Sequence, residues 1–212
     1  MTPKTRSLLV AFMTVTAFYV IASSAQAASL FIGGAKLPAN SKAALSTKIG
    51  LEESVILESS SLSLAISCSG LGATKPELIG EAKAQAEHLS FEACSEVEPT
   101  TCKLGSSTIT TEPLTGLFTT GTSPADKLLL QPKTGKLIET LELLGSCAIA
   151  GEKPVDGQIT FNVPTGQTEE ASQAIEASSS TESSLEIAGH KACFASGRGL
   201  LKLASGSKWS YH

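Results

Sequence analysis

Apolar and polar residues alternate with a period of two in several stretches of this chain. In residues 158–163 (QITFNV), Ile159, Phe161 and Val163 fall on one face and the polar residues fall on the other. This period is typical of a half-buried β-strand. Further strands are predicted on the same grounds at residues 55–57, 62–66, 88–94 (with Leu89, Phe91 and Ala93 on the apolar face), 141–147, 185–187 and 201–203.

Turn signals separate these apolar runs. Glycine and proline occur together at residues 121–124, 132–135, 151–157 and 164–166, where glycine supplies positive φ angles and proline presets the bend. Strands joined by short turns, without regularly alternating helices, predict an all-β fold that is an antiparallel sandwich or barrel. The chain carries no repeat and no linker, so we expect residues 28–212 to form a single β-rich domain.

Two segments have the composition of helices instead. Residues 76–88 (PELIGEAKAQAEH) are rich in helix formers, with Thr74 placed to cap and Pro76 near the first turn. Residues 168–177 (TEEASQAIEA) begin with a threonine followed by two glutamates. Either segment can form a short helix on the β scaffold, although Gly80 costs a helix about 1 kcal/mol.

The first residues have the order of a secretory signal peptide. Lys4 and Arg6 precede an uncharged apolar run at residues 8–22, and Ala25 and Ala27 then supply the small side chains that signal peptidase requires. The alternative is a membrane anchor, but this run is shorter than the roughly 20 residues of a spanning helix. We therefore expect cleavage after Ala27, no membrane segment afterwards, and a protein that is secreted or displayed at the cell surface.

The charge balance excludes one class of partner. Without Lys4 and Arg6, 14 basic residues remain against 20 acidic ones. No cluster of lysine and arginine is present that could displace counterions from nucleic-acid phosphates. The acidic residues are scattered along the chain, which is typical of a solvated surface and not of a polyanionic site.

A series of short motifs runs from the first cysteine to the end of the chain. In order, they are Ile66-Ser67-Cys68, Phe91-Glu92-Ala93-Cys94, Cys102, the segment 109–116 (ITTEPLTG), the turn 130–135 (LQPKTG), Leu143-Leu144-Gly145-Ser146-Cys147 and the ending 203–209 (LASGSKW). In this series the chain resembles a group of uncharacterised exported β-rich proteins of actinobacteria, over about residues 60–210. The resemblance implies export and a β fold, names no reaction, and leaves Cys193 outside the shared pattern.

The five cysteines, Cys68, Cys94, Cys102, Cys147 and Cys193, all follow the predicted cleavage site. They would therefore lie in an oxidising compartment, and their spacing fits no zinc site. We expect one disulfide between Cys94 and Cys102 across a short loop and another between Cys68 and Cys147, with Cys193 free. Cys193 could replace either partner, because a sequence does not fix disulfide connectivity.

Candidate chemistry is sparse. The chain has no G-x-S-x-G elbow, and its internal histidines are His88 and His190. A triad of a serine with His190 and Asp156 is the remaining arrangement for a hydrolase. We predict no catalytic residue, no metal site and no cofactor.

Trp209 and Tyr211 are the large polar aromatics that follow the predicted cleavage site. Their spacing places them on one face of a strand, where they could form a small platform for a ligand such as a sugar ring. The alternative is a contact in the core, because large aromatic side chains usually bury their rings.

These observations predict a non-enzymatic, structural or adhesive protein of the cell envelope or extracellular space. The first alternative is an extracellular module that binds a glycan or another ligand, and the second is a hydrolase. Each alternative makes a different demand on the structure: an exposed platform for the first, and a pocket at His88 or His190 for the second.

Overall fold

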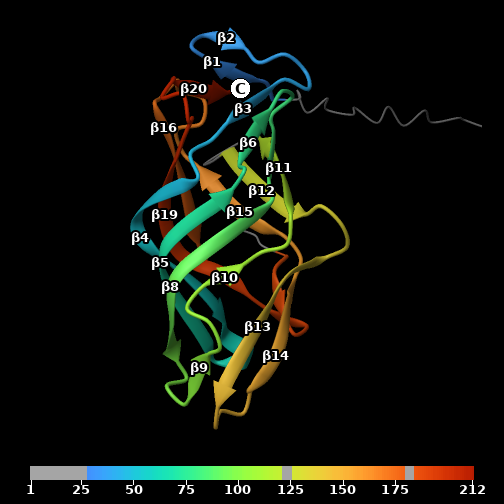
Figure 1. Cartoon of the computed structure of the whole chain (residues 1–212), viewed down its shortest axis with the longest axis vertical. Coiled ribbons are helices and arrows are strands. Elements are labelled where there is room, and N and C mark those ends of the chain that lie inside the picture. Colours follow the sequence, from blue (N-terminus) through green and yellow to red (C-terminus); the bar gives the residue numbers. More distant parts are fainter. Residues whose placement is uncertain (1–27, 121–125, 180–183) are drawn as a thin grey trace, which may run out of the picture.

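The computed structural model describes residues 28–120, 126–179 and 184–212, and this part of the chain is built of antiparallel strands in three sheets (Figure 1). The largest sheet has 12 strands. Their spatial order is β10 (Ile109–Thr110), β8 (His88–Glu98), β5 (Leu64–Thr74), β4 (Lys48–Ser59), β19 (Cys193–Lys202), β16 (Ser172–Ser178), β15 (Ile159–Val163), β12 (Asp126–Pro132), β11 (Leu114–Thr119), β7 (Lys83–Ala86), β6 (Glu77–Ile79) and β3 (Lys42–Ala44).

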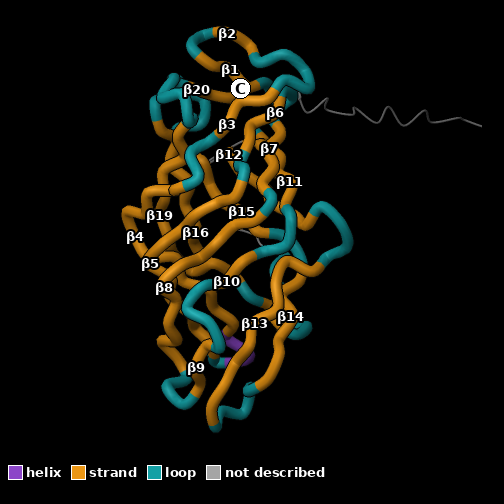
Figure 2. Tube along the Cα trace, viewed as in Figure 1, coloured by secondary structure: helices purple, strands orange, loops and turns teal. Residues whose placement is uncertain are grey.

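Two smaller sheets lie at opposite ends of the elongated body (Figure 1). The five-stranded sheet has the order β18 (His190–Lys191), β17 (Glu186–Ile187), β14 (Gly151–Asp156), β13 (Leu137–Gly145) and β9 (Cys102–Leu104). The three-stranded sheet has the order β2 (Ala35–Lys36), β1 (Leu30–Ile32) and β20 (Trp209–Tyr211). Among the described residues the helical segment is one 3₁₀ turn, η1 (Ser60–Leu62), which Figure 2 shows in purple.

The 12-stranded sheet curls until its β3 end meets β19. The Ser46 amide donates to the Lys202 carbonyl at 2.8 Å, and the Ala204 amide donates to the Ala44 carbonyl at 2.9 Å. These bonds tie the last strand of the sheet back to a strand in its middle. The prediction of an all-β, antiparallel sandwich or barrel is therefore confirmed.

One continuous apolar core fills the curl and extends beneath the five-stranded sheet. At mid-height, the Phe194 ring stacks between Phe91 and Phe161, with centroid separations of 5.4 and 6.0 Å. Because strands from distant parts of the sequence contribute these rings, the core can form only once the long-range strand pairs are in place.

The alternating stretches form strands where the sequence predicts them. Ile159, Phe161 and Val163 are 1%, 3% and 0% exposed on β15. Residues 55–57 and 62–66 contribute to β4 and β5, which pair directly, with Leu57 opposite Ile66. Period-two patterning was therefore sufficient to identify these elements and their buried faces.

Residues 76–88, which the sequence left open as a possible short helix, do not form one. The segment is a β-hairpin of β6 and β7, which places Leu78 opposite Ala84 and turns through Glu81 and Ala82 with positive φ angles. Gly80 packs against the Pro38 carbonyl so closely that a Cβ would overlap it. Burial of Leu78 in the barrel core outweighs the helix propensity of the alanines.

Residues 168–177, the other segment that could have formed a short helix, are not helical either. Most of this segment belongs to β16, a central strand between β15 and β19. Gln173 is fully buried there, and its amide nitrogen donates to the carbonyl oxygens of Thr168 and Trp209 at 2.8 and 2.6 Å. Pairing on both sides and a satisfied buried amide override the local preference for helix.

Three neighbouring strands change their buried face at the same height, at residues 69–70 of β5, 92–93 of β8 and 195–197 of β19, and β4 bulges beside them at residues 50–54 while keeping its buried face. We call this region the bulge belt. In β5, for example, Ile66 and Cys68 are buried, and the next buried side chain is Leu71. On β4, five residues oppose only two on β5 between the pairs Ile49–Leu71 and Val55–Cys68. Such bulges bend a sheet and increase its twist.

The belt also corrects one detail of the predicted alternation. Ala93 was expected on the buried face of β8 with Leu89 and Phe91, but it is exposed and has a φ angle of 48°. The next residue, Cys94, is buried instead. A single left-handed residue therefore reverses the parity of the strand.

The fit between β20 and the loop after β15 gives a stability prediction. A Cβ at Gly166 would overlap the Tyr211 ring, so we expect Gly166→Ala to lower the free energy of unfolding by about 1–3 kcal/mol through overpacking. Gly50→Ala is the matched control, because no atom lies within 4 Å of its Cβ position, and it should change stability by less than about 0.5 kcal/mol. Denaturant unfolding followed by the fluorescence of Trp209 measures both; equal midpoints would contradict the packing described here.

Candidate functional site

The structure joins the cysteines differently from the prediction. Cys68 bonds to Cys94 with a Cα separation of 4.0 Å, and Cys102 bonds to Cys147 with a Cα separation of 5.2 Å. The predicted pairs Cys94–Cys102 and Cys68–Cys147 are therefore wrong. The reason is strand register: Cys68 and Cys94 stand directly opposite each other on β5 and β8, and Cys102 stands opposite Gly145 just before Cys147.

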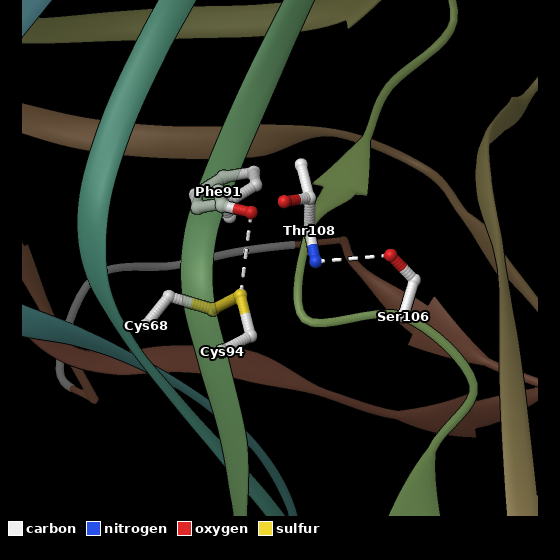
Figure 3. The surroundings of a disulfide bond; sticks show 5 residues. All are labelled: Cys68, Phe91, Cys94, Ser106 and Thr108. Carbon is white, nitrogen blue, oxygen red and sulfur yellow. Dashed lines mark hydrogen bonds between the residues drawn. A yellow bond between two sulfur atoms is a disulfide. The ribbon is translucent and has the colours of Figure 1, made fainter.

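The Cys68–Cys94 disulfide lies at the bulge belt, beside the loop that leads into β10 (Figure 3). The Sγ atom of Cys94 lies 3.3 Å from the Phe91 carbonyl oxygen. In the neighbouring loop, the Thr108 amide donates to Ser106 Oγ at 3.1 Å. The bridge thus pins β5 to β8 where both strands change face.

Cys193 takes part in neither disulfide and is half-buried at the start of β19. It stands opposite Glu58 on β4. Burial raises the pKa of the Cys193 thiol, and the negative charge of Glu58 raises it further. The thiol is therefore harder to ionise than an ordinary cysteine thiol, and the thiolate is the reactive form.

Trp209 and Tyr211 do not form an exposed platform. Both side chains are 0% exposed and pack against Phe118, with ring centroids 5.9 and 4.7 Å away. Burial also raises the pKa of the Tyr211 hydroxyl. Of the two alternatives for these residues, the structure shows the contact in the core, and neither ring has a face open to a sugar.

Among the described residues, no hydrogen bond joins the residues considered for a hydrolase, and Asp156 and His190 lie two strands apart, on β14 and β18. His88 lies on β8, and its Nδ1 atom is 2.6 Å from the carbonyl oxygen of Thr111. His190 is exposed on β18. The Asp156 carboxylate forms a salt bridge with Lys136 at 2.9 Å. An aspartate engaged in this way does not orient His190 as a triad would require.

Two interior hollows are too small for an organic ligand. The upper one has a volume of about 50 Å³ beside Phe118 and Leu130. The lower one has a volume of about 20 Å³ beside Phe91, Phe194 and Glu139, and burial raises the pKa of the Glu139 carboxyl. Volumes of this size hold at most a few water molecules.

A larger groove opens on the outer face at the bulge belt, and its volume is about 490 Å³. Its floor is β5 at Gly70 and Gly72, and its walls are β4 on one side and β8 on the other. On β4, residues 50–54 pair with β19 but have few partners to match them on β5. At this height residues 50–54 of β4 bow away from β5 (Figure 1), and this separation opens the groove.

Charged groups stand on both walls of this groove. Lys48 of β4 and Ser90 of β8 lie opposite the same floor residue, Gly72, so about 10 Å separates the two walls at two strand spacings. A side chain on Gly70 would begin 3.0 Å from the Cβ of Glu92, and one on Gly72 would begin 3.4 Å from a Glu92 carboxylate oxygen. Glu92 thus leans over the glycine floor.

Among the residues that the structure describes, neither the Glu92 carboxylate nor the Lys48 ammonium forms a hydrogen bond or a salt bridge within the chain. On the next strand pair, by contrast, Arg198 binds the carboxylates of Glu52 and Glu176 at 3.0 and 3.3 Å. The groove therefore combines free charge of both signs with a glycine floor over which the Glu92 side chain leans.

Sequence reasoning missed this groove. Its one visible signal is the glycine pair Gly70 and Gly72 inside a strand pattern, which marks a close approach or a bulge. Within the described ranges, no three histidine, cysteine, aspartate or glutamate side chains gather to hold a metal ion. The same ranges contain no helix long and apolar enough to cross a membrane.

No protein-family profile, curated protein or solved structure shows significant similarity to this chain. The resemblance to exported actinobacterial proteins therefore stays a prediction, and functional inference must start from the geometry above.

The disulfide connectivity has a direct test by tryptic mapping without reduction. Cys68 falls in peptide 49–83, Cys94 and Cys102 share peptide 84–103, and Cys147 falls in peptide 137–191. The structure predicts that all three peptides stay joined in one species. The pairing expected from sequence would instead release peptide 84–103 alone, with an internal bridge, and recovery of that species would contradict the structure.

The free thiol gives a prediction of pH dependence. Because its pKa is raised in the folded protein, alkylation of Cys193 should reach half its maximal rate at a higher pH in native protein than in urea. Glu58→Gln should move the native value part of the way down, since burial is the larger cause. A native thiol that reacts as fast as the unfolded one near pH 8 would show that the site is open and unperturbed.

Proposed function

We propose that this chain is an exported, non-enzymatic protein with a structural or adhesive role in the cell envelope or extracellular space. The observation that carries the proposal is the packed interior of the described part of the chain, whose two hollows of about 50 and 20 Å³ are too small to enclose an organic ligand. A rigid β body of this kind acts through its outer surface.

Export is supported by two features. The N-terminal segment has the order of a signal peptide. The two disulfides, Cys68–Cys94 and Cys102–Cys147, suit an oxidising compartment.

The second candidate is an extracellular ligand- or glycan-binding module. The groove at the bulge belt favours it, because a volume of about 490 Å³ lies within the usual range of ligand sites. The groove differs from the platform predicted at Trp209 and Tyr211, since it has no aromatic lining.

Fractionation of producing cells tests the proposal. We expect the protein in the envelope fraction and the medium, with Ala28 as its N-terminal residue, and we expect purified protein to rebind washed envelopes through a high-salt wash. A secreted protein of similar charge is the control. Intact Met1 on cell-associated material would contradict export, and protein that never rebinds envelopes would favour the ligand-binding candidate.

A further inference from the structure

We propose that the groove between β4 and β8 binds an extended peptide segment that carries a lysine or arginine, with the basic group at Glu92. This inference goes beyond the structural or adhesive role and supplies one contact through which the surface could act. Three observations carry it: the open strand pairing, the glycine floor and the free carboxylate.

The open pairing supplies main-chain recognition. Residues 50–54 of β4 face only Ser69 and Gly70 of β5, and no residues of the two strands pair in register between Ile49–Leu71 and Val55–Cys68. An extended peptide offers donors and acceptors at strand spacing and could pair with the backbone at this gap, as in other cases where a peptide adds to a sheet.

The floor is formed by small residues, and the Glu92 side chain lies across its glycines. Gly70 and Gly72 present no side chains along the outer face of β5, and the hollow continues to Thr74. From Ser69 to Thr74 the floor is six residues long, or about 20 Å. This length accommodates an extended chain and leaves its side chains free to reach both walls.

The charges select the ligand. Glu92 lies over the floor without a partner among the described residues, so a cationic group there would gain a charge-assisted hydrogen bond. The Lys48 ammonium on the opposite wall would donate to an acidic side chain or a free carboxylate of the ligand. A glycan is less favoured, because the lining contains no aromatic ring on which a sugar could stack.

The test is an NMR titration of the isotope-labelled protein, purified in the form that its producer releases. The probes are the peptides Ac-GSKSG-amide and Ac-GSQSG-amide, which differ in one charge. We expect the lysine peptide to shift the amides of Gly50, Gly70 and Gly72, and to bind about fivefold more tightly than the glutamine peptide, near the upper end for an exposed ion pair.

Three variants sharpen the outcome. Glu92→Gln should reduce the affinity for the lysine peptide about fivefold and leave the glutamine peptide unchanged. Gly72→Val should abolish binding of both peptides by filling the floor, and its Cβ would meet its neighbours at an ordinary 3.4 Å. Glu152→Gln, at an exposed position on β14, is the matched control and should change nothing.

Equal affinity for the two peptides, or shifts confined to other surfaces, would overturn the proposal. Binding of neutral oligosaccharides at the same amides without peptide binding would also overturn it and would reassign the groove to glycans. The envelope experiment is independent of this one: retention on envelopes with an empty groove would refute the peptide site and leave the structural or adhesive role standing.

Discussion

The fold depends on a single constraint, which is that one long sheet must bury one face along its whole length. A sheet of 12 strands cannot do this while flat, so it must curl and bend. The bulge belt is where it bends, and Gly197 shows how tightly the bend is built: a Cβ there would lie 3.0 Å from the Val55 Cα. Below the belt the strands cover the core shared with the five-stranded sheet, and above it they form the curl.

The same constraint explains what could be read from the sequence. Where a strand keeps one parity, as β15 does with Ile159 and Val163, alternation alone identifies both the strand and its buried face. Where the sheet bends, alternation fails, because no rule assigns a left-handed conformation to an alanine such as Ala93. The segment 76–88 resembles a helix in composition for a different reason, which is that its alanines Ala82 and Ala84 are small enough to pack in the core of the barrel.

The candidate site was hidden for a related reason. The disulfide pairs depend on which residues face each other across β5 and β8, and this register is set by long-range packing that one sequence does not display. The groove depends on the extra residues of β4, which has five residues where β5 has two between the pairs Ile49–Leu71 and Val55–Cys68. Trp209 and Tyr211 drew attention as a chemical pair, yet their rings complete the core, so the outer surface at Glu92 carries the remaining possibility for recognition.

The pairing of β1 with β20 has a mechanical consequence. Ser29 and His212 exchange backbone hydrogen bonds of 2.8 and 3.1 Å, so the two ends of the described chain meet in the last rung of an antiparallel ladder. A pulling force between these two residues would open the rungs one after another, as a zipper opens. A tether attached at one end only would not pull these two strands apart, and the barrel would carry the load as one body.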